Sequence, residues 1–150
     1  MPEQTLNRRR TRRARGFTLI EILVVIVVIA ILATLVAPNV FQNVGTAKAT
    51  TAKTQIEMLA SALDAYRLDN GYYPSTAQGL QALQELPAID PPSNWRGPYL
   101  RKAVPLDPWG RAYLFISPGD VNPTGFDLFS YGADGQLGGE GENADVVSWQ

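Results

Sequence analysis

Residues 8–37 read RRRTRRARGFTLIEILVVIVVIAILATLVA, and this stretch decides the fold of the chain. Six arginines precede Gly16, and the 21 residues that follow, 17–37, contain a single charge, Glu21. A helix of this length is about 31 Å long, close to the thickness of the hydrocarbon layer of a bilayer. Arginines that flank a span stay on the cytoplasmic side. The pattern therefore predicts a single-pass membrane helix over residues 17–37, with the following part of the chain on the outer side.

Glu21 is the exceptional residue of this stretch. A carboxylate in an apolar span is costly unless it is protonated or paired with a cation, and the span contains no Lys or Arg. Cleavage after Gly16 would create a cation, because it leaves a new ammonium group on Phe17. That amine lies four residues before Glu21, about one helical turn away. We expect it to pair with Glu21 of the same chain or of a neighbouring copy.

The run GFTLIE at residues 16–21, between a basic leader and an apolar span, resembles the processing signal of type IV pilins and pseudopilins. The resemblance implies that a prepilin peptidase cuts between Gly16 and Phe17, that Phe17 becomes N-methylphenylalanine, and that Glu21 guides the docking of subunits. Two other interpretations compete. A secretory signal peptide would have a shorter apolar core followed by a small-residue cleavage site. A plain membrane anchor would not need an acid inside the span.

The rest of the chain divides into a leader, a second helical segment and a globular part. Residues 1–16 are polar and basic, and we exclude them from the fold as a leader peptide. After Pro38, which we expect to kink the helix, residues 38–70 are predicted to form an amphipathic helix in the periplasm. Its apolar stripe has spacings of four, three, four and three residues and consists of Ala52, Ile56, Leu59, Leu63 and Tyr66. The pair Asn70-Gly71 predicts the end of this helix.

Residues 71–150 are predicted to form the globular domain. Ser75 and Gln78 have the spacing of a capping box, which predicts a short helix that reaches about Leu86. A proline-rich, packed surface loop follows. Runs of β-branched and aromatic residues between turn signals then predict three strands, over residues 111–117, 126–131 and 146–149. Strands so close in sequence form an antiparallel meander packed on the long helix, so the predicted fold class is α+β.

The composition excludes several classes of function. The 150 residues contain no Cys and no His, so disulfide bonds, thiol chemistry and His-based triads are absent, and no catalytic set of side chains is evident. The formal net charge is −1, but the leader arginines hide an acidic remainder with 7 Lys and Arg against 13 Asp and Glu. An acidic domain is a poor candidate for binding nucleic acid. We therefore predict that the chain is no enzyme and has no nucleic-acid partner.

Residues 132–145 read GADGQLGGEGENAD, a loop rich in glycine and carboxylates. Oxygen donors on a glycine-rich loop suit calcium, which takes about six to eight oxygen ligands. The spacing does not match an EF-hand, because Gln136 and Gly138 stand where that loop has acidic or amide ligands. Spacing alone leaves two hypotheses open, a calcium site and a solvated loop without a ligand.

Five further motifs extend over most of the chain: LDNGYYP (68–74), QGLQAL (78–83), WRGPYL (95–100), DPWG (107–110) and FDLFSYGADGQLGGEGENAD (126–145). Together with the N-terminal signal, they are similar to the major pseudopilin family of type II secretion, general secretion pathway protein G. The resemblance implies a type IV pilin-like fold, a long N-terminal helix on a small antiparallel sheet, with a C-terminal calcium loop. The expected ligands are the side chains of Asp134, Glu142, Asn143 and Asp145 and backbone carbonyls near Tyr131 and Gln136.

The resemblance implies a structural function. The mature chain would polymerise into a short periplasmic filament, the pseudopilus, which helps to export folded proteins across the outer membrane. The implied partners are further copies of the chain, the prepilin peptidase, the minor pseudopilins, the inner-membrane assembly platform and the membrane. We expect a single-pass protein of the inner membrane, with its N-terminus in the cytoplasm and its C-terminal domain in the periplasm. Two alternatives stay open: the subunit of a surface type IV pilus, and a membrane-tethered binding or enzymatic domain.

Overall fold

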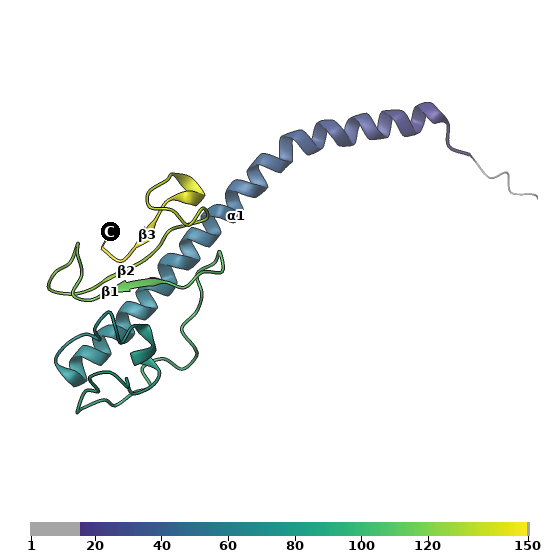
Figure 1. Cartoon of the computed structure of the whole chain (residues 1–150). Helices are drawn as coiled ribbons and strands as arrows, with labels where there is room; N and C mark the ends of the chain where they lie inside the picture. Colours follow the sequence, from purple (N-terminus) through teal and green to yellow (C-terminus); the bar gives the residue numbers. More distant parts are fainter. Residues whose placement is uncertain (1–15, 150) are drawn as a thin grey trace, which may run out of the picture. The chain divides into compact units, whose positions relative to one another are not determined.

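One long helix dominates the molecule. The structure is a computed structural model that describes residues 16–149, apart from the side chains of residues 35–42. This helix, α1, comprises Leu19–Asn70 and is 52 residues long (Figure 1). At 1.5 Å per residue, 52 residues correspond to about 78 Å along the helix axis. The prediction of one long helix is therefore confirmed. The kink predicted at Pro38 lies where the side chains are outside the described residues, and it stays a prediction.

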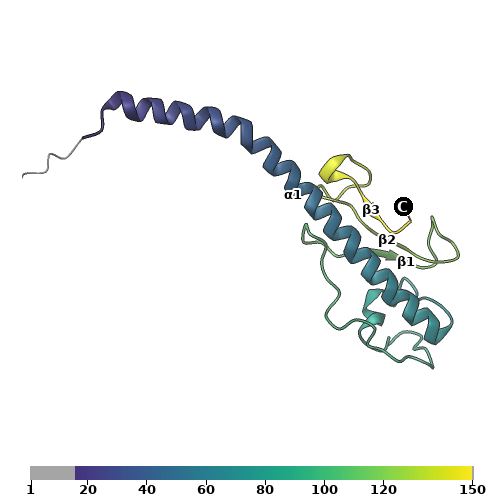
Figure 2. The same ribbon diagram turned by 180° about the vertical axis from the view of Figure 1, so that it is seen from behind.

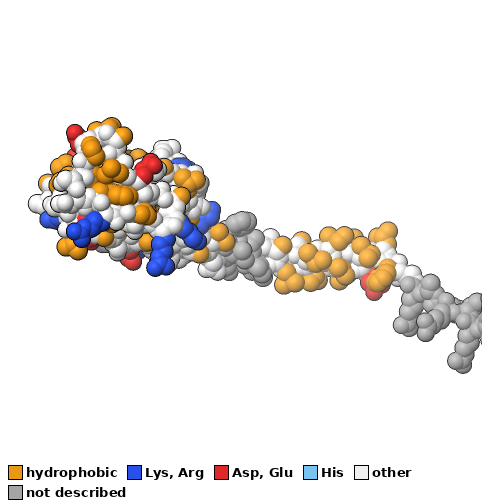
Figure 3. All heavy atoms as spheres, turned by 90° about the horizontal axis from the view of Figure 1, so that it is seen from below, with side chains coloured by type: hydrophobic (Ala, Val, Ile, Leu, Met, Phe, Trp, Pro, Cys, Tyr) orange, Lys and Arg blue, Asp and Glu red, His pale blue; other side chains and the backbone are white. Residues whose placement is uncertain are grey.

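The chain forms two compact units, Met1–Asn39 and Val40–Gln150, and α1 contributes to both. In the first unit, most coloured side chains on the visible face of the helix are hydrophobic, together with an acidic side chain (Figure 3). In the part of the chain that the structure describes, no helix is both long and apolar enough to cross a membrane. The span predicted over residues 17–37 runs into residues 35–37, whose side chains lie outside this description.

Helix α1 ends where the sequence predicts. Gly71 has φ +86°, a left-handed conformation that glycine adopts without a steric penalty. Its N–H donates to the Arg67 carbonyl at 2.7 Å, and the side-chain amide of Asn70 donates to the Tyr66 carbonyl at 2.8 Å. Both bonds satisfy carbonyl groups that the last helical turn leaves without a partner.

The predicted antiparallel meander is confirmed, with shorter strands. Strands β1 (Leu114–Ile116), β2 (Asp127–Ser130) and β3 (Val146–Val147) form one sheet in the order β1-β2-β3. Leu114 lies opposite Phe129 between β1 and β2, and Phe129 lies opposite Val147 between β2 and β3. Front and back views both show the strands beside the second half of α1 (Figures 1 and 2).

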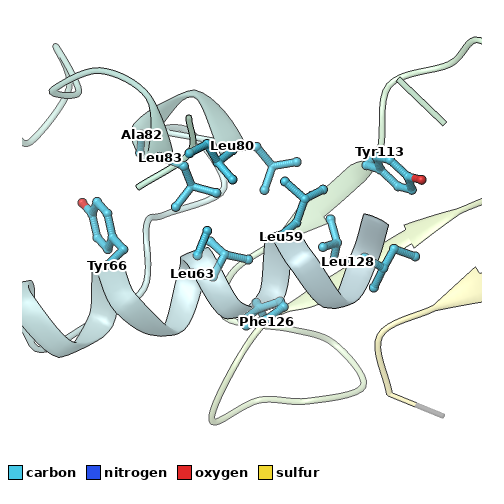
Figure 4. Close-up of a cluster of buried hydrophobic side chains, with 12 residues drawn as sticks. Leu59, Leu63, Tyr66, Leu80, Ala82, Leu83, Tyr113, Phe126 and Leu128 are labelled. Carbon is cyan, nitrogen blue, oxygen red and sulfur yellow. The ribbon is translucent and has the colours of Figure 1, made fainter. Parts of the chain in front are cut away.

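The core lies between the second half of α1 and the rest of its unit. All five residues of the predicted stripe are at most 2% exposed: Ala52, Ile56, Leu59, Leu63 and Tyr66. Leu59 and Leu63 of α1 pack with Leu83 and with Leu128 of β2 in this core (Figure 4). The stripe is buried because the period of the helix places residues three and four apart on one face.

The helix predicted after Ser75 is wrong in type and length. The capping box itself forms, because the Gln78 N–H donates to Ser75 Oγ at 3.2 Å and the Ser75 N–H donates to Gln78 Oε1 at 2.9 Å. Only a four-residue 3₁₀-helix follows, η1 (Leu80–Leu83). Gly79 interrupts the right-handed path with φ 63° and ψ −170°. Leu86, at the predicted end of this helix, is 52% exposed.

Candidate functional site

The junction between Gly16 and Phe17 lies just before α1, in a segment that is neither helix nor strand. Phe17 is 77% exposed, and a Cβ atom added to Gly16 would meet no heavy atom within 4 Å. The fold therefore places no steric demand on residue 16, and the peptide bond is open to an enzyme. Any requirement for glycine at this position has to come from that enzyme.

Thr18 caps the first turn of α1, the turn that contains Glu21. The Glu21 N–H donates to the Thr18 carbonyl at 3.1 Å and to Thr18 Oγ1 at 3.3 Å. Thr18 and Glu21 have the three-residue spacing of a capping box, so this cap could have been predicted from the sequence. A carboxylate in the first turn also interacts favourably with the helix dipole. Glu21 therefore favours the start of the helix, in addition to any role between subunits.

The first half of α1 exposes an apolar surface. Over residues 19–32, every Leu, Ile and Val is between 47% and 83% exposed. A helix that is apolar on all sides is normally buried in lipid or in protein, and a contiguous exposed surface of this kind marks an interaction site. This surface therefore has to be covered by something other than the described residues of its own unit.

The second candidate site is the acidic loop, residues 132–145, which closes on itself. It contains one short 3₁₀-helix, η2 (Gly141–Asn143). Gly132 and Gly139 have φ +63° and +91°, and a Cβ atom on either would approach a backbone oxygen of residues 143–144 to 2.7 Å or less. Two turns of the loop therefore contact its last segment so closely that only glycine fits.

Asp145 and Asp134 are the two predicted ligands whose carboxylate oxygens bond to backbone N–H groups of the loop. Asp145 Oδ2 accepts a bond from the Gly138 N–H at 2.9 Å, while its Oδ1 is buried and has no hydrogen-bond partner. Asp134 Oδ1 accepts from the Gln136 N–H at 3.0 Å. A buried carboxylate oxygen without a donor is unfavourable, so Asp145 leaves a place for a cation.

The other predicted ligands make contacts within the protein, although those of Asn143 and Tyr131 involve a backbone N–H and a ring and not the predicted ligand atoms. The side chain of Glu142 lies against Gly45 of α1, where a Cβ atom would overlap it. The Asn143 N–H donates to the Glu140 carbonyl at 3.1 Å. Tyr131 packs its ring edge-on against Phe129, with 5.2 Å between ring centroids. Across residues 16–149, no three His, Cys, Asp or Glu side chains form a group that could hold a metal ion.

The loop nevertheless fits a calcium ion on two grounds. Its donors are all oxygens, as calcium prefers, and Asp145 Oδ1 is a buried oxygen in need of a partner. A cavity of about 250 Å³ separates α1 from the loop, and its lining includes Lys53, Gly141 and Asp145. Carbonyl groups of the loop would have to supply most of the remaining ligands, because the acidic side chains do not converge.

A buried network beside the loop was not predicted from the sequence. Asp107 is 4% exposed, and its Oδ1 accepts from the backbone N–H groups of Trp109 and Arg111 at 3.0 and 2.8 Å. Its Oδ2 accepts from Ser130 Oγ on β2. The nearby phenol of Tyr113 has a raised pKa, first because it is buried and second because Asp107 is negatively charged. The motif DPWG contained Asp107, but its partner Ser130 lies on a strand that is distant in sequence.

Arg111 connects this network to the acidic loop. Its guanidinium donates to the carbonyl oxygens of Gly132 and Ala133, the second at 2.8 Å. No sequence signal marked Arg111, because its partners are backbone atoms about twenty residues away.

Comparison with known protein families matches nearly the whole chain. The profile described as Type II secretion system (T2SS), protein G matches residues 39–149. The profile described as Prokaryotic N-terminal methylation motif matches residues 11–37, which include Gly16, Phe17 and Glu21.

Curated relatives and a solved structure agree with these profiles. The type II secretion system core protein G of Pseudomonas aeruginosa is 50% identical over 139 residues, 92% of this chain and 96% of the relative. That of Vibrio cholerae is 46% identical over 142 residues, 94% of this chain and 95% of the relative. The crystal structure of the major pseudopilin from the type 2 secretion system of enterohaemorrhagic Escherichia coli superposes with a TM-score of 0.63 at 38% identity, covering 75% of this chain and 95% of that chain.

Proposed function

The chain belongs to the type II secretion system protein G family, and from this premise we propose how it matures and assembles. It is a major pseudopilin, a structural subunit and not an enzyme. We propose that a prepilin peptidase cuts between Gly16 and Phe17, that Phe17 is N-methylated, and that the mature chain polymerises into the periplasmic pseudopilus. The matched relatives favour this function over a surface type IV pilus and over a tethered binding domain.

The observation that carries the proposal is the exposed apolar surface of residues 19–32. Before assembly, lipid of the inner membrane would cover this surface. After assembly, the same helices of other copies would cover it. The six leader arginines support an orientation with the N-terminus in the cytoplasm and the domain in the periplasm. Minor pseudopilins and the inner-membrane assembly platform are the expected further partners.

Glu21 gives the assembly its register. In the uncut chain Glu21 has no cationic side chain within the span. Cleavage places the ammonium group of Phe17 four residues before it in the chain. Opposite charges attract strongly where water is excluded, so pairing of Glu21 with the amine of a neighbouring copy favours one axial position of that copy over others.

The substitution Glu21→Ala tests this assembly step. We expect the variant to insert and to be cut, because the Gly16–Phe17 junction is exposed, but to polymerise poorly. Mass spectrometry of the membrane-extracted protein measures cleavage and methylation, and sedimentation of sheared filaments measures assembly. Glu57→Ala, which removes an exposed acid from the second half of α1, is the matched control and should assemble normally. Normal filaments from Glu21→Ala would contradict the proposal.

We further propose that the acidic loop binds calcium through Asp145 and Asp134, with backbone carbonyls as the remaining ligands. When bound, the ion would neutralise the carboxylates of Asp145 and Asp134 and supply the missing partner of Asp145 Oδ1. Five glycines of the loop have positive φ values, and glycine loses more backbone freedom on folding than other residues. A bound ion would therefore offset part of the entropy cost of ordering the loop.

Chelation tests the calcium site in the full chain in detergent micelles. All three tryptophans, Trp95, Trp109 and Trp149, lie in the second unit, so tryptophan fluorescence reports its melting. Calcium at a hundredfold excess over its dissociation constant adds about 2.7 kcal/mol to the free energy of unfolding. EDTA should therefore lower the melting temperature by on the order of 10 °C.

Two variants serve as controls for the chelation experiment. Asp145→Asn should abolish the difference between calcium and EDTA. Asp120→Asn, a change at an exposed position outside the loop, should preserve it. Equal melting temperatures of the unaltered chain in calcium and in EDTA would count against the site.

A further inference from the structure

Arg111 is a cation at the base of the acidic loop, and its guanidinium binds backbone oxygens of the loop. Two of its N–H groups donate to the carbonyls of Gly132 and Ala133. The planar guanidinium can hold two acceptors at once in a fixed geometry, which an ammonium group cannot do. Charge-assisted bonds of this kind are among the stronger hydrogen bonds in proteins. Arg111 therefore fixes the position at which the loop leaves the sheet.

The base from which Arg111 reaches the loop is itself held firmly. The backbone N–H of Arg111 donates to Asp107 Oδ1 at 2.8 Å, and its carbonyl accepts from the Asp107 N–H at 2.7 Å. Asp107 is 4% exposed and accepts from Ser130 Oγ of β2. The guanidinium thus extends from a closed turn that is bonded to the central strand of the sheet.

The first turn of the loop, residues 132–136, wraps around this guanidinium. A Cβ atom on Gly135 would lie 2.9 Å from Arg111 Cζ, so the backbone of the turn contacts the guanidinium directly. The remaining part, residues 137–145, has no guanidinium bonded to its carbonyls among the described contacts, although Lys53 of α1 lines the same cavity as Gly141 and Asp145. Leu137 is 82% exposed, and Asp145 Oδ1 is buried without a partner.

We propose that Arg111 is a positioning residue that orders residues 132–136 without any metal, so that calcium orders only residues 137–145. The inference rests on the calcium site proposed above. Arg111 acts through the two carbonyls that it holds, and it does not touch the ion. It presents a preformed half-site to calcium, which lowers the conformational entropy that binding has to remove.

Calcium titration of the full chain in micelles separates positioning from simple charge. Arg111→Lys keeps the charge but loses the two-pronged geometry, and Arg111→Met loses both. We expect both variants to bind calcium about tenfold more weakly, equivalent to about 1.4 kcal/mol. If Arg111 acted only as a nearby positive charge, Arg111→Met would bind calcium more tightly and Arg111→Lys would be unchanged. That result would overturn the proposal. Arg101→Met removes the same charge from an exposed position and should not change the affinity.

Hydrogen exchange followed by NMR tests the division of the loop and stays informative if calcium does not bind. The Gln136 amide is bonded to Asp134 in the first turn, and the Gly138 amide is bonded to Asp145 in the remaining part. In the unaltered chain, EDTA should accelerate exchange at Gly138 at least tenfold and at Gln136 less than twofold. Equal acceleration at both amides would overturn the proposal.

The variant Arg111→Met completes the exchange experiment. In EDTA its Gln136 amide should exchange at least fivefold faster than that of the unaltered chain. An unchanged Gln136 rate would overturn the role of Arg111. If EDTA accelerates neither amide of the unaltered chain while Arg111→Met accelerates Gln136, the calcium site fails and the positioning of residues 132–136 by Arg111 stands.

Discussion

The two halves of helix α1 share one regular backbone but differ in what surrounds them. In the first half, the Leu, Ile and Val side chains of residues 19–32 are at least 47% exposed. In the second half, Leu59, Leu63 and Tyr66 are 0% exposed and form the core with η1 and β2. Apart from Glu21, the side chains of residues 19–32 are apolar on every side of the helix, whereas the apolar residues of the second half form a single stripe.

This difference separates folding from assembly within one helix. The second half is stabilised by tertiary packing inside the chain, as is usual for helices in globular proteins. The first half lacks such packing in the described structure, and under the proposed function lipid and neighbouring copies stabilise it instead. Substitutions in the two halves should therefore change different observables.

The largest expected effect comes from a pair of leucine truncations, one in each half. Leu63→Ala should lower the free energy of unfolding of the second unit by about 3 kcal/mol, because a buried leucine leaves a cavity. Leu23, which is 54% exposed, can lose its side chain with less than about 0.5 kcal/mol of effect on that unit. Urea unfolding of both full-length variants, followed by tryptophan fluorescence, measures the two values.

The comparison between the halves fails if Leu23→Ala destabilises the second unit as much as Leu63→Ala does. It becomes sharper if Leu23→Ala leaves unfolding unchanged and lowers the yield of filaments. In that case the same chemical change affects folding in one half and assembly in the other.

A second, smaller effect should appear at alkaline pH. Burial raises the pKa of Tyr66 from its ordinary value of 10.0 to about 12. Between these values the unfolded chain loses the phenolic proton while the folded chain keeps it. Stability should therefore be unaffected below pH 10 and then fall by up to about 1.4 kcal/mol per pH unit. Urea unfolding at pH 9, 10 and 11 measures this loss.

The variant Tyr66→Phe is the control for the alkaline experiment. It should show a shallower loss of stability above pH 10 than the unaltered chain. An identical slope would mean that another group, and not this tyrosine of the second half, titrates on unfolding. Residues 19–34 contain no tyrosine, so the effect can sharpen the contrast between the halves.

The smallest effect distinguishes two buried tyrosines at pH 7. The Tyr66 hydroxyl is buried without a hydrogen-bond partner, so Tyr66→Phe should raise the free energy of unfolding by up to about 1 kcal/mol. The Tyr113 hydroxyl is bonded to Gln55 Oε1 of α1 at 2.5 Å, so Tyr113→Phe should lower it by about 1 kcal/mol. Changes of the same sign in both variants would contradict this account of how the core packs on α1.

Local sequence signals predicted much of the fold. The helical period and the Asn70-Gly71 stop predicted α1 and its buried stripe, because both depend on backbone geometry and on neighbours three or four residues apart. The run of β-branched and aromatic residues between turn signals predicted β2, although Asp127, which alternates with Phe126 and Leu128, is buried as they are. The capping box at Ser75 formed, but the conformation of Gly79 ended the helix that it predicted after a single turn. The Leu83 carbonyl accepts instead from the N–H groups of Tyr99 and Leu100, which are distant in sequence.

The sequence predicted which residues belong to the candidate sites, but it did not predict how their side chains are arranged. The spacing of Gly16, Phe17 and Glu21 marked the proposed processing junction, and the carboxylates of residues 132–145 marked the loop. Sequence spacing could not indicate that Glu142 lies on Gly45 of α1 while Asp145 keeps an unpartnered oxygen. Such placements depend on the path of a glycine-rich backbone, which has few local constraints.

The sequence by itself determined the long helix, its apolar first half, its amphipathic second half and the acidic loop, since each follows from the order of neighbouring residues. Only the tertiary structure decided that Asp107 accepts a hydrogen bond from Ser130 of β2. The same is true of the bonds from the Arg111 guanidinium to the carbonyls of Gly132 and Ala133. The physical reason is that these bonds join groups about twenty residues apart. Their partners include backbone atoms, which every residue carries and which leave no mark in the sequence.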